Sequence, residues 1–283
     1  RHGAADQYEN LAVVSFELKD FVKTKEYLAK SLAINTEIGN RKGEAKVYGD
    51  HGDLFYTLGE YVKAREYREK ALAIRINLGD REGEAREYNR LGFLCLRLEE
   101  YAAAEKHYEM ALVIAKDIGV REIELDSLDG LAISILRQGN NIEALRYLYQ
   151  RFETYENLRL SLRNDDHLKT SFLEVQGVNT YTFCSALLCE NNNPREALYV
   201  EELGRARGLT DLQADRYSVQ TNISANPKSW IGIENIVRKE TDRVFLYISF
   251  ADDDLFIWIL KTSGEIHFKR RTVGEEILGT RLN

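Results

Sequence analysis

The sequence predicts a mainly α-helical protein: an α-solenoid of helix pairs with a period of 40 residues, followed by the first strands of an α/β domain. One observation is an apolar-Gly pair that ends at Gly39, Gly79 and Gly119 and so recurs every 40 residues. Another is that both prolines lie after residue 190, so none interrupts a series of helices before it. The third is residues 244–250, which are β-branched and aromatic on both faces.

Each period contains two amphipathic segments, and we expect each segment to form a helix. Gly52 and Gly92 fall where a first helix needs a small residue so that its partner can approach. Gly39, Gly79 and Gly119 end the second helices, where glycine adopts the left-handed conformation at least cost. One pair cannot bury its apolar side alone, so the pairs must stack. The expected helices are Glu44 to Leu58, Tyr61 to Asn77, Glu84 to Leu98 and Tyr101 to Asp117.

Aromatic and small residues recur at fixed places in the second and third units: Tyr48, Gly52, Phe55, Leu58, Gly59, Tyr61, Ala64, Tyr67, Ala71 and Leu72, then Tyr88, Gly92, Leu98, Tyr101, Ala104, Tyr108, Ala111 and Leu112. This set resembles the signature of the tetratricopeptide repeat (TPR) family, which implies a right-handed superhelix. The period exceeds the commonest TPR form, of about 34 residues, as in G-protein-signalling modulators and in animal TPR proteins that carry a CHAT domain. A fourth unit, Ser127 to Leu160, keeps Gly139 and Ala144 but has Asn141 and Arg151 at the aromatic and small positions.

After residue 165 the pattern predicts one more helical pair, a linker and a small sheet. Pro194 lies in the first turn of the last helix, a position that proline favours. Three apolar runs separated by turn residues predict a meander, and the first strand is apolar enough to need cover on both faces. The predicted parts are 1–165 as TPR repeats, 166–216 as a TPR-like pair (Leu168 to Cys189 and Pro194 to Asp215), 217–230 as a linker, and 231–283 as an incomplete α/β domain with a helix at Ile231 to Lys239 and strands at Val244 to Phe250, Leu255 to Leu260 and Glu265 to Lys269.

The segments Glu201 to Leu212 and Val244 to Phe268 resemble the helix before a CHAT domain and its opening strands; CHAT is a caspase-like module found after TPR arrays. In that family a His-Gly pair and a later cysteine form a protease-type dyad, in which the imidazole activates the thiol. Neither motif occurs in this stretch, so we expect no catalytic residue, cofactor or metal. The alternative is that the chain is the regulatory and substrate-recruiting half of a caspase-like cysteine peptidase whose catalytic residues lie beyond residue 283.

Composition narrows the classes of partner. Lys and Arg number 39 against 46 Asp and Glu, a formal charge of −7 without a basic run, which disfavours nucleic acid and anionic membranes as partners. Cys95, Cys184 and Cys189 have no metal-ligand spacing and suit a reducing compartment, and no apolar stretch is long enough to span a membrane. We therefore expect a cytoplasmic protein. Because the chain does not begin with Met and its only Met is Met110, we interpret it as a piece of a longer protein.

Several residues that could suggest chemistry are better explained as structural. All three cysteines fall in predicted helices and are expected to be buried core thiols. His51 stands where the other units have leucine, so we expect a partly buried packing residue rather than a ligand. Arg41, Arg81 and Arg121 follow the glycine turns, and we expect each to pair with the C-terminal dipole of the preceding helix.

The first helix of each TPR is expected to line a concave groove, which is the candidate binding site. Four of its residues are arginines, and guanidinium groups bind carboxylates in a bidentate manner, so an acidic peptide or helix of a protein partner would suit the groove. The alternative is that these arginines pair with Glu87, Glu99 or Asp129 and bind nothing. The predicted groove residues are Lys46, Asp53, Tyr56, Arg86, Asn89, Arg90, Phe93, Arg97 and Arg137, with Gly49 and Ile133 beside them.

These patterns favour a non-enzymatic interaction scaffold whose groove captures a partner and positions the CHAT-like domain. The lysine and asparagine with which chaperone-binding TPRs hold a terminal carboxylate are missing, because Gly49 with Asp53 and Asn89 with Phe93 stand at those places. An adaptor of G-protein or polarity signalling shares the 40-residue period but does not explain residues 244–268.

Overall fold

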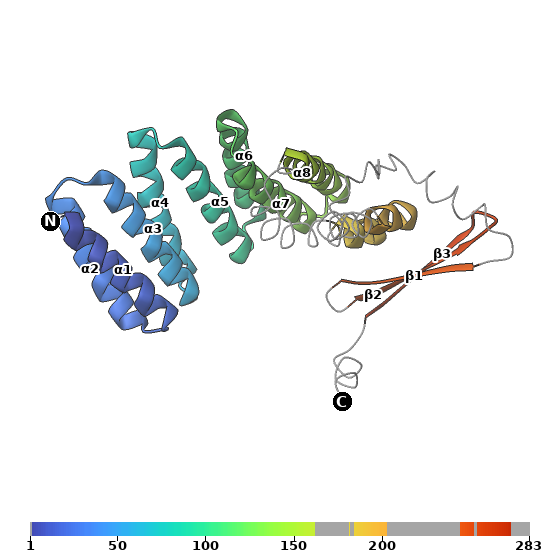
Figure 1. Ribbon diagram of the computed structural model, residues 1–283, viewed down its shortest axis with the longest axis horizontal. Helices are drawn as coiled ribbons and strands as arrows, with labels where there is room; N and C mark the ends of the chain where they lie inside the picture. Colours follow the sequence, from blue (N-terminus) through green and yellow to red (C-terminus); the bar gives the residue numbers. More distant parts are fainter. Residues whose placement is uncertain (1, 162–180, 182–183, 203–243, 252–253, 273–283) are drawn as a thin grey trace, which may run out of the picture. The chain divides into compact units, whose positions relative to one another are not determined.

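Helix pairs make up the N-terminal part of the chain, and a small sheet lies in the C-terminal part (Figure 1). The computed structural model describes residues 2–161, 181, 184–202, 244–251 and 254–272. Two compact units, residues 1–154 and residues 155–283, divide the chain. The predicted linker at 217–230, the predicted helix at 231–239 and most of the segment 201–212 lie outside the described residues.

Eight helices follow one another from residue 2 to residue 161, and they confirm the predicted solenoid of helix pairs. The first helix of each pair has an odd number and the second an even number. The helices are α1 (His2–Glu17), α2 (Phe21–Glu37), α3 (Arg41–Thr57), α4 (Tyr61–Leu78), α5 (Arg81–Arg97), α6 (Tyr101–Ile118), α7 (Arg121–Arg137) and α8 (Asn141–Ser161).

The first helices begin three residues earlier than the sequence pattern predicted. The side chains of Asn40 and Asp80 cap α3 and α5, because each accepts a hydrogen bond from a glycine N–H three residues on, at 3.1 Å and 3.0 Å. Arg41, Arg81 and Arg121 are consequently the first residues of α3, α5 and α7.

The expected pairing of these arginines with a preceding helix dipole was wrong. Each guanidinium forms an ion pair with the glutamate three residues on, as in Arg81–Glu84 at 2.7 Å and Arg121–Glu124 at 2.5 Å. The glutamate side chains are buried and lie in the first helical turn, where a negative charge is stabilised by the helix dipole. The arginine series is therefore structural, as expected, but through a different contact.

Residues in the left-handed conformation follow the helices both in the turns between pairs and in the turns within a pair. Gly79 (φ 67°) and Gly119 (φ 73°) cap α4 and α6, as predicted. The turn inside each pair also needs this conformation, and Gly59 supplies it with φ 76°. At the same place in the first and third units, Lys19 and Glu99 adopt φ 60° and 61° although neither is glycine. The turn geometry therefore follows from helix packing as well as from residue type.

Stacking joins the pairs: the second helix of each pair contacts the first helix of the next. Between α2 and α3, Leu28 packs with Val47 and Leu54. The corresponding joint between α6 and α7 places Tyr108 in one cluster with Leu128 and Leu131. These apolar contacts are the core of the solenoid, and they hold the exposed sides of the first helices in register.

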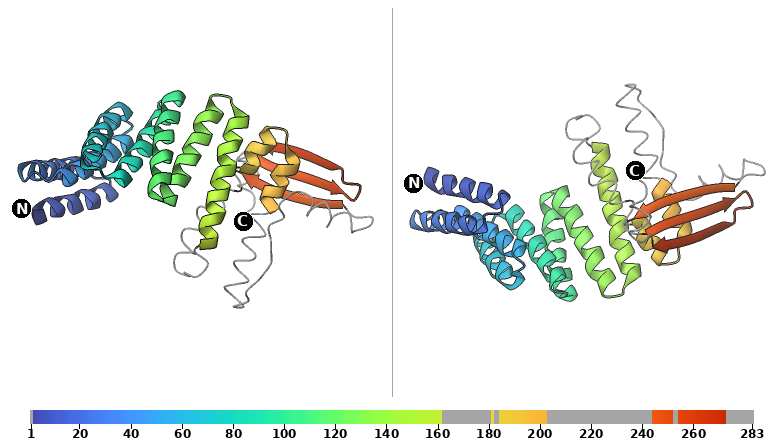
Figure 2. Two further views of the ribbon diagram at one scale, coloured as in Figure 1. Left: turned by 90° about the horizontal axis from the view of Figure 1, so that it is seen from above. Right: turned by 90° about the horizontal axis from the view of Figure 1, so that it is seen from below.

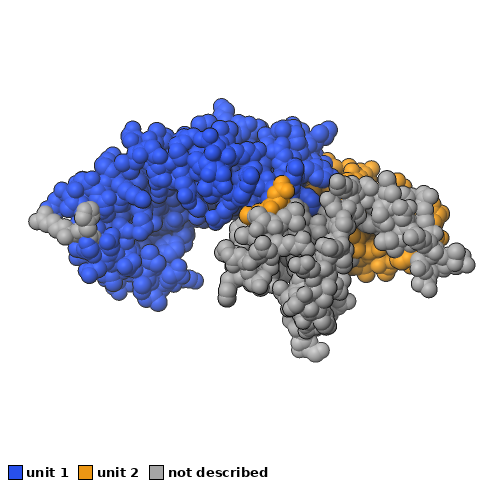
Figure 3. Space-filling view, turned by 45° about the horizontal axis from the view of Figure 1, so that its top comes forward, with its two compact units in different colours: residues 1–154 blue, residues 155–283 orange. Residues whose placement is uncertain are grey.

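Unit 1 is a bowed body (Figure 3). Direct contacts join the first helices α5 and α7 of neighbouring pairs, whereas no comparable contact joins the second helices α4 and α6. Because elements on the inner side of a bend lie closer together than those on its outer side, the first helices face the inner side of the bend at this joint.

A three-stranded antiparallel sheet of order β1-β2-β3 lies in unit 2 and confirms the predicted meander. Its strands are β1 (Val244–Ala251), β2 (Asp254–Lys261) and β3 (Ile266–Thr272). Helical residues 184–190 and 194–202 lie beside the sheet in both views of Figure 2. The buried Trp258 donates its indole N–H to the carbonyl oxygen of Pro194 at 2.9 Å, and its ring packs at a tilt against the rings of Phe256 and Phe268. On the face of the sheet opposite Trp258, the β1 residues Val244 and Leu246 are exposed.

The three cysteines are buried thiols, as predicted. Burial and the nearby Glu201 carboxylate raise the pKa of Cys189 to about 12, and burial raises the pKa of Cys95 above its usual range. A thiol with a raised pKa is a poor nucleophile because little thiolate forms. These thiols therefore act as apolar core residues.

His51 is also a core residue, as its leucine-like position predicted. Its side chain is 4% exposed, and its ring stacks on Tyr67 with centroids 4.8 Å apart. The buried Nδ1 atom has no hydrogen-bond partner among the described residues. Burial, with the nearby ammonium groups of Lys25 and Lys70, lowers the pKa of His51 from 6.5 to about 4.

Replacing His51 by leucine, the residue at this place in the other units, is expected to stabilise unit 1 in a pH-dependent manner. Unfolded histidine binds a proton near pH 6.5 and the buried ring only near pH 4, so falling pH favours the unfolded wild-type chain. The H51L variant should therefore be more stable by about 1 kcal/mol near pH 8, and its advantage should grow by about 3 kcal/mol towards pH 4. Urea unfolding of both proteins across this range measures the difference. A difference that does not change with pH would contradict the buried neutral ring.

Candidate functional site

All nine predicted groove residues lie on the first helices α3, α5 and α7. Positions 40 residues apart are structurally equivalent, so Asp6, Asp50 and Asp126 occupy places matched to Lys46, Arg90 and Arg86. We call the set the first-helix surface: Asp6, Lys46, Asp50, Asp53, Tyr56, Arg86, Asn89, Arg90, Phe93, Arg97, Asp126 and Arg137.

An aromatic cluster lies in the middle of this surface. The Tyr56 ring on α3 lies 5.4 Å from the Phe93 ring on α5 and 5.5 Å from the Tyr61 ring. Phe93 is 42% exposed, although a phenylalanine at a packing position would be buried. The cluster therefore bridges two repeats and leaves an apolar patch accessible to solvent.

Arginines without carboxylate partners flank the aromatic cluster. Arg90 and Arg97 lie one helical turn before and after Phe93 on α5, and Arg137 lies on α7 at the position of Arg97. All three side chains are exposed, and none forms an ion pair with a carboxylate of the described residues. Arg97 instead donates a hydrogen bond to the Tyr61 hydroxyl oxygen at 3.2 Å and lies 5.7 Å from that ring's centroid. The guanidinium groups are thus available to an anionic group.

The carboxylates that could have neutralised these arginines are bound elsewhere. Glu87 pairs with Arg68 at 3.0 Å and Asp129 pairs with Arg151. Both arginine partners are buried and come from second helices. Glu99, the third carboxylate considered, occupies the left-handed turn before α6. Among the described residues, none of these three carboxylates pairs with Arg90, Arg97 or Arg137. The alternative that the groove arginines are neutralised internally holds for Arg86, which pairs with two other carboxylates.

Lys46 and Arg86 of the surface form ion pairs that join neighbouring units. Lys46 pairs with Glu9 of α1 at 2.6 Å. Arg86 pairs with Glu82 on its own helix at 3.0 Å and with Glu122 of α7 at 3.5 Å. A ligand would have to displace these pairs to reach Lys46 or Arg86.

Asn89 likewise joins two first helices. Its amide donates to the carbonyl oxygen of Ile123 at 3.3 Å, and its side-chain oxygen accepts a hydrogen bond from Ser127 at 2.8 Å. Because both polar groups are occupied, Asn89 contributes mainly to the contact between α5 and α7.

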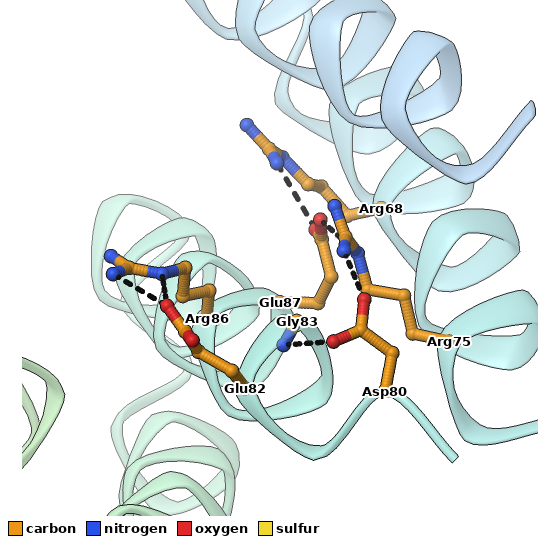
Figure 4. Close-up of polar contacts among 7 residues, drawn as sticks. All are labelled: Arg68, Arg75, Asp80, Glu82, Gly83, Arg86 and Glu87. Atoms are coloured by element: carbon orange, nitrogen blue, oxygen red, sulfur yellow. Dashed lines mark hydrogen bonds and ion pairs between the residues drawn. The ribbon is translucent and has the colours of Figure 1, made fainter. Parts of the chain in front are cut away.

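A buried ion network lies beneath this surface at the joint between α4 and α5 (Figure 4). Arg68 bridges Glu87 on one side and Asp53 on the other, and the Glu87 side chain is only 4% exposed. Arg75 pairs with Glu87 at 3.3 Å and with Asp80 at 2.7 Å. The network fixes the position of Asp53, whose side chain remains half exposed on the first-helix surface.

Two aspartates of the surface have raised pKa values. Burial, with the nearby carboxylates of Glu9 and Asp53, raises the pKa of Asp50 to about 6, although the Lys46 ammonium opposes the shift. Burial, with the carboxylates of Asp129 and Glu122, raises the pKa of Asp126 to about 6. Both groups are charged above neutral pH and lose their charge in mildly acidic solution.

The repeat signature extends over most of unit 1. The family model described as tetratricopeptide repeat matches residues 4–77 and 83–157, more than half of the chain. The chain belongs to the tetratricopeptide repeat family.

Curated relatives match about half of the chain. Human and mouse tetratricopeptide repeat protein 28 are each 29% identical to the chain over 149 residues, which is 52% of this chain and 6% of theirs. The alignment thus spans a small part of these much longer proteins.

Solved structures with low sequence identity share the fold. BtubC (BKLC) from P. vanneervenii has a TM-score of 0.61 at 18% identity, over 73% of this chain and 80% of that one. The Rap conjugation gene regulator of plasmid pLS20, solved in complex with the Phr* peptide, has a TM-score of 0.50 at 18% identity, over 81% and 64%. These likenesses establish a TPR-type solenoid.

Arg68 is a residue of this TPR site that the sequence analysis missed, as are Asp6, Asp50 and Asp126 of the first-helix surface. Tyr67 was matched there with Tyr108, but these lie 41 residues apart, and the period of 40 places Arg68 opposite Tyr108. The packing glycines confirm this register, because a Cβ on Gly52 would meet Arg68 and one on Gly92 would meet Tyr108. A charge at an aromatic position was the signal that could have revealed the network.

The described part of the chain contains no group of three or more His, Cys, Asp or Glu side chains that could hold a metal ion. None of its helices is long and apolar enough to cross a bilayer. The resemblance of residues 244–268 to a CHAT domain stays a prediction, as does the compartment.

Removing one partner of the ion network should lower the unfolding free energy of unit 1, whereas replacing both partners by apolar residues should restore most of it. Changing Glu87 to valine leaves Arg68 buried with Asp53 as its remaining partner, so unit 1 should lose about 3 kcal/mol of unfolding free energy. The double variant R68L/E87V reproduces the Leu28–Val47 contact of the preceding joint and should recover most of this loss. Urea unfolding of wild type and both variants measures the values. A double variant no more stable than E87V would contradict the equivalence of the two joints.

Proposed function

We propose that the chain is an interaction scaffold whose first-helix surface binds an acidic peptide or helix of a protein partner and positions a CHAT-like domain beside it. The observation that carries this proposal is the set of exposed arginines Arg90, Arg97 and Arg137, which have no carboxylate partner in the described chain, around the accessible Phe93.

Charge and shape both favour such a ligand. Unpaired guanidinium groups in a protein of net charge −7 form a local positive surface that attracts carboxylates, and each can hold one in a bidentate manner. An accessible aromatic patch between them provides the apolar contact that fixes a peptide in place. The Rap neighbour, solved with its Phr* peptide, gives a precedent for a peptide ligand on this fold.

Scaffold activity is consistent with the chemistry of the described residues. The buried cysteines have raised pKa values or lie in the core, so they offer no activated thiol. We infer that binding, and not catalysis, is the contribution of this part of the protein. We place its action in the cytoplasm, because free thiols persist in a reducing compartment.

Reversing two charges should abolish partner binding. Arg90 and Arg97 are exposed and form no ion pair in the described chain, so R90E/R97E should fold normally while it repels carboxylates. Peptides of roughly twelve residues, long enough in extended form to span the first helices, are selected from a random display library on the immobilised wild-type chain. We expect acidic peptides with an apolar residue, and binding at least about tenfold weaker to R90E/R97E.

A matched control separates this surface from general charge. K106E/K116E makes the same change in net charge on the exposed side of α6 and should bind the selected peptides like wild type. Circular dichroism verifies that all variants keep their helicity. Equal binding by R90E/R97E and the control would contradict the assignment of Arg90 and Arg97 to the binding site.

A further inference from the structure

The first-helix surface is divided into an acidic half and a basic half. Asp6, Asp50 and Asp53 lie on α1 and α3, whereas Arg90, Arg97 and Arg137 lie on α5 and α7. The change of sign is sharpest at one repeat position, because Asp50 and Arg90 are 40 residues apart and structurally equivalent. Phe93 and Tyr56 lie at the boundary, in contact with each other.

Internal pairing leaves the acidic half negative. Lys46, the basic residue among these positions of α3, is neutralised by Glu9 of α1. Asp53 gives one carboxylate oxygen to Arg68 and keeps its side chain half exposed. Asp6 and Asp50 have no ion pair with another described residue.

Internal pairing leaves the basic half positive. Arg86 is held by Glu82 and Glu122, a group that keeps one negative charge, whereas Asp129 and Arg151 neutralise each other. The three guanidinium groups of Arg90, Arg97 and Arg137 outweigh that charge and the carboxylate of Asp126. Asp126 is the opposing carboxylate in this half, and the nearby guanidinium groups of Arg151 and Arg90 act against the rise of its pKa. The excess of charge therefore has opposite signs at the two ends of the surface.

We infer that the ligand is a bipolar peptide segment held in one orientation, with a basic residue on Asp50 and Asp53 and acidic residues on Arg90, Arg97 and Arg137. This inference rests on the proposed function and adds the orientation and the second charge. Neighbouring first helices lie about 10 Å apart, and an extended chain advances about 3.3 Å per residue. The basic and acidic residues of the ligand should therefore be separated by roughly three to six residues, with an apolar residue for Phe93 between them.

The order of charges on the ligand can be tested with the peptides selected above. They should contain Lys or Arg as well as Asp or Glu, at this separation. A photo-crosslinker placed beside the basic residue should label residues 2–57 of the full chain, and one placed beside the acidic residues should label residues 81–137. Labelling is carried out well above the pKa of Asp50, so that its carboxylate is charged.

An exchange of charge between the equivalent positions Asp50 and Arg90 then tests whether these charges determine the orientation of the peptide. The double variant D50R/R90D keeps composition and net charge. It should bind the peptides selected on the wild-type chain about tenfold more weakly, or weaker still, and it should exchange the two labelling patterns. D50N/R90Q should make labelling from each end more even if the exchange variant folds poorly. The control exchange K106E/E109K on α6 should change neither affinity nor labelling.

The outcomes separate the two proposals. Uniformly acidic selected peptides, or labelling that D50R/R90D leaves unchanged, would overturn the bipolar orientation while the arginine site stands. Selected peptides that bind R90E/R97E as well as wild type would overturn both.

Discussion

Every feature of unit 1 depends on one packing relation, in which the second helix of each pair buries its apolar side against the first helix of the next. A single pair cannot meet this requirement, so the repeat is stable only as a stack. Small residues set the approach of the helices: the Tyr108 ring lies against Gly92 of its own pair and Gly130 of the next, where a Cβ would come within 2.8 Å and 2.2 Å. The side chains that remain exposed on the first helices are those that are not buried between stacked pairs.

The joints differ in chemistry, and this difference determines which charges stay free. Between the first and second units, Leu28 meets Val47, whereas the next joint places Arg68 against Glu87 at the same two positions. A buried ion pair contributes little net stability because of its desolvation cost. Its consequence here is that Glu87 is occupied by Arg68 and Arg75 and is not a partner of Arg90 or Arg97 on the exposed side of α5.

Most of the fold could be predicted because its signals are local. The 40-residue period, the glycine turns and the alternating strands identify the helix pairs and the meander from spacing alone. The predicted first helices began late because Asn40 and Asp80 fit a preceding turn as well as a cap, and only the N–H of Gly43 or Gly83 decides between them. The left-handed Glu99 was not predictable from residue type, because helix packing imposes that conformation on a residue that disfavours it.

The sequence by itself determined the period, the helix faces and the residues that lie on the first helices, because these depend on neighbours a few positions apart. Only the tertiary structure decided which charges meet. Arg68 reaches Glu87 across 19 residues of chain, and Arg151 of α8 reaches Asp129 of α7. Such partners are chosen by side-chain reach across a helix joint and by burial, neither of which is encoded in spacing along the chain, and they leave Arg90, Arg97 and Arg137 free.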